Sequence, residues 1–397
     1  MIGVLGAGQL GRMLALAGYP LGLRFRFLDA AHEAPVRDLA EFLRADFTEF
    51  AALDRFAAGL DVATYEFENV PVDTVEHLAR RIPIYPPPAA LRASQDRLEE
   101  KTFFRSLGIA TAPFLAVSAR ADLDRALEEI GYPAVLKTRR MGYDGKGQYL
   151  IRERAAAEQA WQTLQRAGSV SDGGFAVAYA SGSLLEGFVR FDRELSQLAV
   201  RGRDGRMAFY PLVENHHADG LLRLSLAPAP NRTPELEQMA RDYATRVLEA
   251  LNYVGVLAIE FFQQGDQLLA NEMAPRVHNS GHWSIEGAET SQFENHLRAI
   301  LGFPLGATAA REACAMLNII GDLPDTRAIL AQAGTHLHLY GKKARPGRKI
   351  GHITVRSSTI EGVRDRVEQL RPLLTQIEFP KHKPRAAITG SAGGEGP

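Results

Sequence analysis

Two carboxylates stand at the ends of two apolar segments that the sequence predicts to be neighbouring strands. Glu260 follows the apolar residues 254–259, and Glu272 follows residues 267–271. The turn at residues 264–266 is typical of an antiparallel hairpin, which would bring the two side chains together. Buried carboxylates repel each other unless a cation lies between them. Since Mg²⁺ uses few protein carboxylates and keeps positions for nucleotide oxygens, the pair predicts a magnesium–nucleotide site, with two exposed strand ends as the alternative.

A glycine-rich segment with three cations, residues 139–148, predicts a phosphate-binding loop. It joins the predicted strands 133–137 and 148–151 and does not have the Gly-Lys-Ser/Thr ending of a Walker loop. Glycines let backbone N–H groups turn toward phosphate oxygens, and the cations offset the phosphate charge. Lys137 lies in an apolar strand and therefore needs a counter-charge, which a phosphate would supply. The alternatives are a plain hairpin tip and a lysine that reaches solvent.

A polar segment, residues 275–282, follows the second glutamate at once. Arg276 is suited to bind an oxyanion with two hydrogen bonds. His278 and His282 are also compatible with ordinary loop histidines, which is the interpretation we prefer for His282. Zinc fits poorly, because the chain offers no set of thiolates and no pair of histidines on a convincing helix.

The amino-terminal residues 6–11, Gly-Ala-Gly-Gln-Leu-Gly, match the glycine fingerprint of dinucleotide-binding folds directly after a predicted strand. Asp29 ends the next strand, where a ribose-binding acid would lie. Taken alone, these residues are equally compatible with a nicotinamide enzyme and with a doubly wound domain that does not bind that cofactor. Nothing downstream resembles a hydride-transfer site. Residues 65–69 follow a third strand at its carboxyl end, and they predict either part of a substrate crevice or a solvated loop.

The elements that must position these residues divide the chain into three parts. Strands at 2–5, 23–28 and 62–67 alternate with helical segments, which predicts a parallel, doubly wound sheet. Four prolines within residues 83–88 then interrupt the pattern. We expect a protein of the α/β and α+β classes, with a Rossmann-like domain (1–93), a central domain (94–300), a small β-rich carboxy-terminal domain (301–380) and a disordered tail (381–397). The other predicted elements are helices at 9–17, 95–107, 155–165, 234–251, 292–301 and 361–374 and strands at 182–188, 194–200, 207–212, 315–320, 336–340 and 352–355.

The composition excludes several classes of protein. The 397 residues are 46% hydrophobic and 23% charged, as in soluble globular proteins of two or three domains. A net charge of -1 does not favour nucleic-acid binding, and no apolar run has the roughly 18 residues of a membrane helix. The chain begins directly with a strand instead of a signal peptide. The single cysteine, Cys314, excludes a disulfide framework and is expected to be a buried thiol. We therefore predict a cytoplasmic protein that binds neither nucleic acid nor membrane.

Taken in order, these motifs resemble the ATP-grasp superfamily and, within it, the N5-carboxyaminoimidazole ribonucleotide synthetase family. The most specific segments are residues 142–147, residues 271–282, and Tyr340-Gly341-Lys342 followed by Arg345 and Arg348. The resemblance covers nearly the whole chain and implies an ATP-grasp fold between the Rossmann-like and carboxy-terminal domains. It also implies an ATP-dependent carbon–nitrogen ligase of de novo purine biosynthesis. Such a ligase would carboxylate 5-aminoimidazole ribonucleotide with bicarbonate, through a carboxyphosphate intermediate.

The resemblance implies roles for individual residues. ATP would be bound by Arg97, Lys137, Gly142, Tyr143, Asp144, Gly145, Lys146, Gly147, Gln148, Glu186, Gly187, Phe188, Val189, Glu194, His217, Asn271 and Glu272. Mg²⁺, or Mn²⁺ in its place, would be bound by Glu260 and Glu272. Aminoimidazole ribonucleotide and bicarbonate would lie among Tyr143, Asp144, Arg276, His278, Asn279, Ser280, Lys342 and Arg348. Of these, Asp144, Arg276, Lys342 and Arg348 would act in catalysis, with Asp144 positioning the amine or accepting its proton. Residues 213–216 are more acidic than is usual in the family, which leaves the role of that expected loop open.

Alternative functions remain at this stage. A formate-dependent glycinamide ribonucleotide transformylase or a biotin carboxylase would use a related fold with formate or biotin. An NAD(P)-dependent oxidoreductase depends on Gly6, Gly8, Gly11 and Asp29, and a regulatory nucleotide-binding protein is disfavoured by the two glutamates. The basic run 342–349 predicts a phosphate-binding wall, with a solvated charged turn as the alternative. The family leads us to expect a homodimer.

Overall fold

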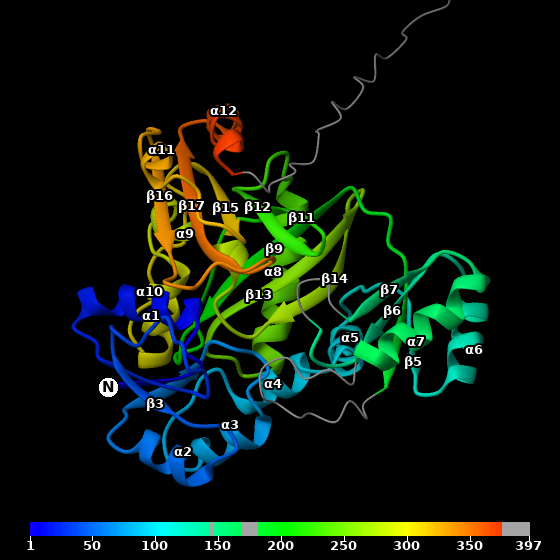
Figure 1. Ribbon diagram of the computed structural model, residues 1–397, viewed down its shortest axis with the longest axis horizontal. Helices are drawn as coiled ribbons and strands as arrows, with labels where there is room; N and C mark the ends of the chain where they lie inside the picture. The colour runs from blue at the N-terminus through cyan, green and yellow to red at the C-terminus, as the bar shows by residue number, and fades with distance from the viewer. Residues whose placement is uncertain (143–146, 168–181, 375–397) are drawn as a thin grey trace, which may run out of the picture.

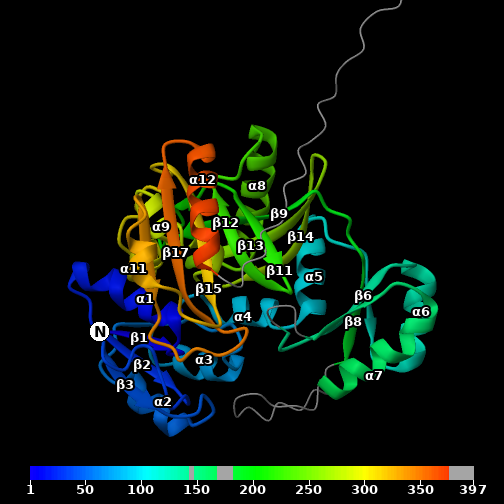
Figure 2. The same cartoon turned by 45° about the horizontal axis from the view of Figure 1, so that its top comes forward.

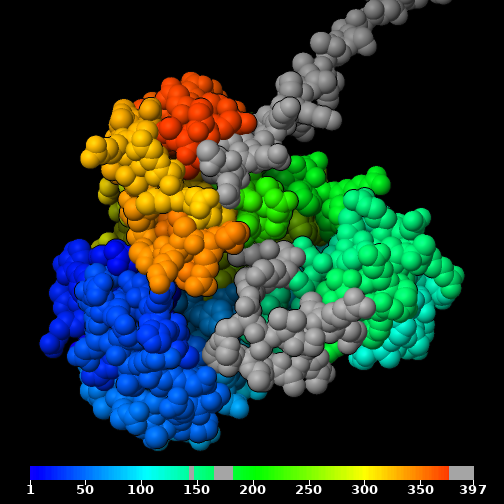
Figure 3. All heavy atoms as spheres, in the orientation of Figure 1, coloured from blue at the N-terminus to red at the C-terminus, as the bar shows by residue number. Residues whose placement is uncertain are grey.

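The computed structural model describes residues 1–142, 147–167 and 182–374, without the side chains of residues 165–167. Three sheets follow one another along the chain (Figure 1). In the space-filling view the amino-terminal part, the part around residues 114–167 and the carboxy-terminal part form separate lobes (Figure 3). Within the described ranges, no helix is both long and apolar enough to cross a membrane.

The amino-terminal sheet is parallel and has four strands in the order β3-β2-β1-β4. Its strands are β1 Ile2–Leu5, β2 Phe25–Asp29, β3 Glu41–Arg44 and β4 Val62–Tyr65, and its helices are α1 Gln9–Gly18, η1 Tyr19–Leu21, α2 Phe50–Ala57 and α3 Val72–Ala79. Every residue of β1 and β4 is buried, as expected for a parallel sheet that is covered on both faces. Leu5 pairs with Leu28 and Tyr65, so β1, β2 and β4 end at one edge of the sheet. The residues that follow these strands therefore meet.

The second sheet is small and antiparallel, in the order β5-β8-β6-β7. Its strands are β5 Phe114–Val117, β6 Ala134–Thr138, β7 Gln148–Ile151 and β8 Ser183–Gly187. Helices α6 Arg120–Ile130 and α7 Ala157–Ala167, the latter after η2 Arg154–Ala156, pack on its outer side (Figure 2). Two helices, α4 Pro88–Ser94 and α5 Arg97–Ser106, connect this sheet to the amino-terminal one. The prolines thus end the first pattern as expected, but Pro88 also begins a helix, because a first helical residue needs no N–H partner.

The third sheet has nine strands and extends through the central and carboxy-terminal parts without a break. Along it the order is β14-β13-β9-β11-β12-β15-β17-β16, and β10 pairs with β9. The strands are β9 Arg193–Arg201, β10 Met207–Phe209, β11 Val213–Ala218, β12 Leu221–Ala227, β13 Gly255–Gln264, β14 Gln267–Ala274, β15 Ala313–Ile320, β16 Thr335–Leu339 and β17 Lys349–Ser357. The helices are α8 Pro234–Ala250, η3 Asn279–Gly281, α9 Ser284–Gly287, α10 Gln292–Leu301, α11 Thr326–Leu330, α12 Ile360–Leu370 and η4 Arg371–Leu373. The pairing of β12 with β15 joins the two parts.

The expectation of a loop at residues 213–217 is wrong, because these residues form strand β11. A polar sequence of this kind is unusual for a buried strand, but each polar side chain has a partner. Glu214 forms ion pairs with Arg193 and His216 at 3.0 Å, and Asn215 donates a hydrogen bond to Ser196 at 3.0 Å. Buried polar groups are tolerated when they are paired in this way.

Candidate active site

Two adjoining hollows lie between the small sheet and the nine-stranded sheet. The outer hollow measures about 430 Å³ and the inner one about 230 Å³. Both are lined by Lys137, Gln148, Gly220 and Phe262, so the two hollows adjoin and together make up the candidate site. The space is roomy enough for a nucleotide in an extended conformation.

The outer hollow has an aromatic wall and a polar floor. The rings of Phe191 and Phe262 are stacked, with centroids 4.7 Å apart and planes at 11°. Residues 186–189, expected to contact adenine, line the same hollow as they leave β8. A flat base fits between such a ring pair and a strand end. Neither phenylalanine was predicted as a site residue, although Phe262 directly follows the metal-site strand segment.

A buried charge cluster lies between the two hollows. Glu186 accepts a hydrogen bond from Lys137 at 2.9 Å, and the ammonium of Lys101 lies 3.6 Å from the same carboxylate. Burial would raise the pKa of Glu186, but the charges of Lys137 and Lys101 outweigh it and lower the pKa to about 2. Lys137 is thus held by a carboxylate instead of reaching freely into solvent. Lys101 was not predicted; its position between Leu98 and Phe104 at helical spacing was the available signal.

The two predicted metal ligands are direct partners. Glu260 of β13 pairs in register with Glu272 of β14, so both side chains project from the same face of the sheet into the inner hollow. Burial and the charge of Glu272 raise the pKa of Glu260 to about 7. Behind them, burial and the same charge raise the pKa of Glu100 to about 8, and Glu100 accepts the N–H of Met273 at 2.7 Å. Excess negative charge at this point is what a divalent cation would neutralise.

This pair fits Mg²⁺ better than a metal held by protein alone. Across the described residues, no group of three or more His, Cys, Asp or Glu side chains is arranged to hold a metal ion. Mg²⁺ commonly binds one or two carboxylates and completes its shell with water and phosphate oxygens. Asn271 lines the same hollow beside them.

His217 of β11 and Glu194 of β9 line the inner hollow on the same sheet as the carboxylates, and they form an ion pair. Burial by itself would lower the pKa of His217, but the Glu194 carboxylate and the charge of Glu260 raise it. A cationic imidazole beside two glutamates would add to the positive side of the site. The predicted nucleotide residues His217 and Glu194 are therefore brought together.

The polar segment after β14 supplies a wall of the inner hollow. Arg276 forms an ion pair with Glu68, and Gln95 holds that loop by donating to the Glu68 carbonyl at 2.8 Å. Residues 65–69 are therefore packed against this polar segment and are not a solvated loop, but none of them lines either hollow. His278 and Asn279 line the hollow. Asn279 is held by reciprocal hydrogen bonds with Asn318 on β15, at 2.6 and 3.1 Å.

Burial, followed by the charges of Arg276 and Lys349, lowers the pKa of His278 well below its usual value. Its ring is therefore neutral, and its Nε2 lies 3.6 Å from Glu260.

The expectation that Ser280 contacts the substrate is corrected by its burial. Its side chain has no exposed surface, and its hydroxyl is bonded to Ser196 and to His278, each at 2.8 Å. Ser280 therefore acts on the site only through other residues. His282 is also buried, so it is not an ordinary exposed loop histidine.

The basic run 342–349 packs against the amino-terminal domain. Lys342 is bonded to Gln9, and Lys343 forms an exposed ion pair with Glu33. Arg348 donates to the carbonyl of Lys343 at 3.2 Å. Among the described residues, the cation of this run that lines the inner hollow is Lys349, not Lys342 or Arg348. Lys349 was not predicted by number, although it ends the predicted basic wall.

The amino-terminal glycine motif is filled by the protein's own carboxylates. The N–H groups of Gly8 and Gly11 donate to Glu66 at 2.6 and 2.9 Å, and Ala7 donates to Asp29 at 2.9 Å. A Cβ atom at Gly8 would lie 2.7 Å from the Glu66 carboxylate, so this approach requires glycine. A dinucleotide pyrophosphate would need the same N–H groups. The motif is therefore structural here, which argues against a nicotinamide enzyme.

Comparison with known proteins agrees with this geometry. The chain matches three family models: a ribonucleotide synthetase preATP-grasp domain over residues 1–95, an ATP-grasp domain over residues 102–293, and a phosphoribosylaminoimidazole carboxylase C-terminal domain over residues 314–366. It is 50% identical to the N5-carboxyaminoimidazole ribonucleotide synthase of Pseudomonas aeruginosa, over 94% of this chain and 99% of that one. The chain belongs to the N5-carboxyaminoimidazole ribonucleotide synthase family.

Solved structures support the assignment to the N5-carboxyaminoimidazole ribonucleotide synthase family. The synthetase from Thermus thermophilus is 55% identical, with a TM-score of 0.88 and coverage of 96% of this chain and 100% of that one. The Aspergillus clavatus enzyme in complex with ADP and 5-aminoimidazole ribonucleotide is 32% identical, with a TM-score of 0.85 and coverage of 95% and 98%. The protein is therefore an ATP-grasp ligase, as the motifs predicted.

Part of the predicted loop of this synthase lies outside the described residues, namely Tyr143, Asp144, Gly145 and Lys146. Its two ends are described. Arg97 donates to the carbonyl of Gly142 at 3.0 Å, and the carbonyl of Gly147 accepts the N–H of Thr138 at 2.8 Å. Gln148, directly after the loop, lines both hollows. The loop therefore begins beside Arg97 and ends beside Gln148, both of which line the inner hollow.

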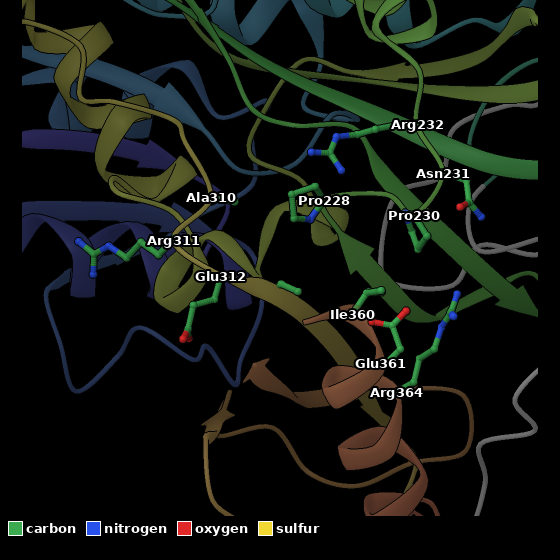
Figure 4. Close-up of a pocket in the computed structure, with 11 residues that line it drawn as sticks. Pro228, Pro230, Asn231, Arg232, Ala310, Arg311, Glu312, Ile360, Glu361 and Arg364 are labelled. Carbon is green, nitrogen blue, oxygen red and sulfur yellow. The ribbon is translucent and has the colours of Figure 1, made fainter. Parts of the chain in front are cut away.

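A further hollow, of about 400 Å³ and separate from the outer and inner ones, lies near the start of α12 in the carboxy-terminal part of the synthase (Figure 4). It contains charges of both signs, and Glu361 and Arg364 lie beside each other at α12. Two of its cations pair with carboxylates outside the lining: Arg232 with Glu237 at 2.7 Å and Arg311 with Glu289 at 3.4 Å. None of the described site residues lines it. We therefore assign it no role in the reaction.

Proposed function

We propose that this enzyme uses ATP and bicarbonate to carboxylate the exocyclic amine of 5-aminoimidazole ribonucleotide. The observation that carries the proposal is the pairing of Glu260 with Glu272 in the inner hollow, which His278 and Lys349 also line. This arrangement joins a site for metal and triphosphate to a site for a small anion. The Aspergillus clavatus relative, which was solved with ADP and 5-aminoimidazole ribonucleotide, supports the same substrates.

In this proposal ATP lies along the two hollows. The adenine lies against Phe191 and Phe262 at residues 186–189, and the phosphates extend past Lys137 into the inner hollow. Arg97 and Lys137 offset the phosphate charge. Mg²⁺, or Mn²⁺ in its place, would be held by Glu260 and Glu272, and it would supply charge neutralisation at the phosphates.

Bicarbonate is a poor electrophile and has to be activated. Its oxygen attacks the γ-phosphorus of ATP, which forms a carbonate–phosphorus bond and releases ADP, so the first product is carboxyphosphate. Lys349 and Arg276 stabilise the negative charge that develops, because cations that are already in place need no reorganisation. The enclosed inner hollow limits the access of water to this labile anhydride.

The amine then completes the reaction. Its nitrogen attacks the carbonyl carbon of carboxyphosphate, or the CO₂ that carboxyphosphate releases; the bond to phosphate breaks, and inorganic phosphate leaves. The amine loses one proton, for which we propose Asp144 as the acceptor. In the same proposal Tyr143, Lys342 and Arg348 bind the phosphate-bearing nucleotide.

The decisive experiment is ADP release with bicarbonate, measured with and without 5-aminoimidazole ribonucleotide. We expect the nucleotide to raise the rate strongly, and we expect formate to be unable to replace bicarbonate. Glu272→Gln should abolish the stimulated rate, whereas Glu289→Gln, which changes an exposed carboxylate that lines neither the outer nor the inner hollow, should not. Stimulation by formate with glycinamide ribonucleotide would instead establish the transformylase alternative, and a requirement for biotin would establish the carboxylase.

We also propose a homodimeric, cytoplasmic enzyme. Leu16, Tyr19 and Leu21 are exposed on α1 and η1, and Phe303 is exposed just after α10, which packs against α1. Exposed apolar side chains of this kind favour a subunit contact. The buried free thiol of Cys314 suits a reducing compartment. Light scattering on the purified enzyme would test the dimer.

A further inference from the structure

A row of buried polar side chains crosses the nine-stranded sheet and ends at His278. Ser225 of β12 donates to Asn215 of β11 at 2.8 Å, and Asn215 donates to Ser196 of β9 at 3.0 Å. Ser196 donates to Ser280 at 2.8 Å, and the Ser280 hydroxyl lies 2.8 Å from Nδ1 of His278. The first four residues are each at least 96% buried. The role proposed for the site does not use these four residues.

The row has a direction. The amide oxygen of Asn215 accepts a hydrogen bond from Ser225, and its nitrogen donates one to Ser196. The Ser196 hydroxyl therefore accepts from Asn215 and donates to Ser280. Because a hydroxyl has a single proton, Ser280 is left to donate to the imidazole. These hydrogen bonds therefore orient the Ser280 hydroxyl as a donor to Nδ1 of His278.

A second donor fixes the same nitrogen. The backbone N–H of Ser280 donates to Nδ1 of His278 at 3.3 Å, as in a helix amino-terminal cap. A backbone N–H cannot act as an acceptor, so this contact also favours an unprotonated Nδ1, but at 3.3 Å it is longer than the 2.8 Å contact of the Ser280 hydroxyl. In a neutral imidazole the proton then lies on Nε2. That nitrogen faces Glu260 at 3.6 Å.

Gln292, which is fully buried at the start of α10, fixes the backbone of His278. Its Oε1 accepts the His278 N–H at 2.9 Å, and its Nε2 donates to the His278 carbonyl at 2.6 Å. Gln292 can lie this close to the chain only because residue 281 is glycine, since a Cβ atom at Gly281 would lie 2.7 Å from the Gln292 amide. The ring can therefore turn only about its side-chain bonds, and Ser280 limits that rotation.

We propose that Ser196, Asn215 and Ser280 are positioning residues that hold His278 as the Nε2–H tautomer, with its proton directed into the site. His278 then serves as a hydrogen-bond donor to an anionic oxygen beside Glu260. It does not serve as a proton acceptor from that side. This inference rests on the proposed function for the identity of the anion, bicarbonate or carboxyphosphate, but not for the tautomer itself.

The tautomer can be measured without any substrate. In the full-length protein with ¹⁵N-labelled histidine, we expect His278 to show an unprotonated Nδ1 and a protonated Nε2. The signal is assigned by its loss in His278→Gln. Ser280→Ala removes the side-chain donor, and we expect a mixture of tautomers; Ser280→Thr keeps the hydroxyl and should restore the wild-type spectrum. A wild-type ring with its proton on Nδ1 would overturn the proposal.

Kinetics provide the second test. Loss of a positioning partner behind a site group lowers activity by roughly 10- to 100-fold, so we expect kcat of Ser280→Ala and Ser196→Ala to fall by about tenfold with KM for ATP unchanged. Asn215→Asp has no N–H to give Ser196, which would reverse the row, and it should shift the tautomer as Ser280→Ala does. Thr74→Val is the matched control, since it removes a buried hydroxyl that bonds the carbonyl of Phe47 in the amino-terminal domain.

The outcomes separate this inference from the proposed function. If Ser280→Ala left both the His278 spectrum and kcat unchanged, the row would not set the tautomer and the inference would be wrong. If 5-aminoimidazole ribonucleotide failed to stimulate ADP release by the wild-type enzyme, the proposed function would fail, while the spectrum would still decide the tautomer.

Discussion

Glu260 and Glu272 face each other across β13 and β14 as register partners, with a β-bulge directly after Glu260. Two carboxylates at this spacing destabilise the protein unless a proton or a cation separates them. Successive side chains of a strand point to opposite faces, so the next residue, Phe261, is buried in the core while the glutamates line the hollow. The electrostatic strain of this pair therefore lies where the metal and the triphosphate are expected.

The first prediction concerns the pH dependence of stability without metal. The folded pKa of Glu260 is about 7, above its usual value of 4.5. A carboxyl group whose pKa is raised on folding adds to the free energy of unfolding. This contribution is fully present below pH ~4.5 and is lost as the pH rises through about 7. We expect the Tm of the metal-free enzyme to fall across this window, and we expect a smaller fall in Glu260→Gln. Calorimetry at several pH values measures both.

Glu100, whose pKa is about 8, should retain a smaller pH dependence in that variant. Addition of Mg²⁺ with ADP should raise the wild-type Tm above neutral pH and should raise that of Glu260→Gln much less. A Glu260→Gln profile identical to the wild-type profile would show that this carboxylate is not under strain.

The second prediction concerns the buried ion cluster. Lys101→Met should leave Glu186 with one cation fewer and lower the free energy of unfolding by about 3 kcal/mol, as expected when one partner of a buried pair is removed. Because the folded pKa of Glu186 is about 2, its contribution is present above pH ~4.5 and is lost as the pH falls through 2. Urea unfolding near neutral pH measures the change.

Arg92→Gln is the control for this variant. Arg92 forms an exposed ion pair with Glu76, and such pairs contribute about 0–1 kcal/mol. Equal losses for the two variants would mean that the cluster between the hollows is no stronger than a surface pair.

The third prediction concerns the aromatic wall. Phe191→Ala should remove one ring of the stacked pair and raise the Kd for ADP by roughly 3- to 10-fold, which corresponds to about 0.5–1.5 kcal/mol for an aromatic contact. Isothermal titration measures this. Phe303→Ala changes an equally exposed phenylalanine elsewhere and should leave the Kd unchanged. An unchanged Kd for Phe191→Ala would place the base elsewhere.

The fourth prediction concerns the glycine motif. Glu66→Ala leaves the N–H groups of Gly8 and Gly11 without their acceptor and should lower the free energy of unfolding by about 1–3 kcal/mol. Inorganic phosphate should raise the Tm of this variant more than that of the wild type, because the start of α1 is then open to an anion. Glu66→Gln keeps an acceptor and should lose less. Binding of NADH to the wild type, measured by its fluorescence, would contradict this account.

Much of the site could be predicted because its signals are local. The turn at residues 264–266 sets the register of the hairpin, and register then brings Glu260 opposite Glu272. The ends of the glycine-rich loop follow from the two strands that it joins. The buried Cys314 follows from its apolar neighbours, and burial raises the pKa of its thiol to about 12. The order of motifs then identified the family, which the comparisons confirmed.

Tertiary structure decided which side chains share a space across long sequence separations. The glycine motif could not reveal that Glu66, more than fifty residues later, occupies its N–H groups. The polar sequence of β11 looks like a loop until Ser196 and Ser225 pair with it. Lys101 of α5 reaches Glu186, and Lys349 at the start of β17 lines the inner hollow, only because packing brings these elements beside the site. Local sequence determines strands, turns and register, but partners brought together by packing depend on the whole fold, and these partners decide whether a buried polar group is structural or functional.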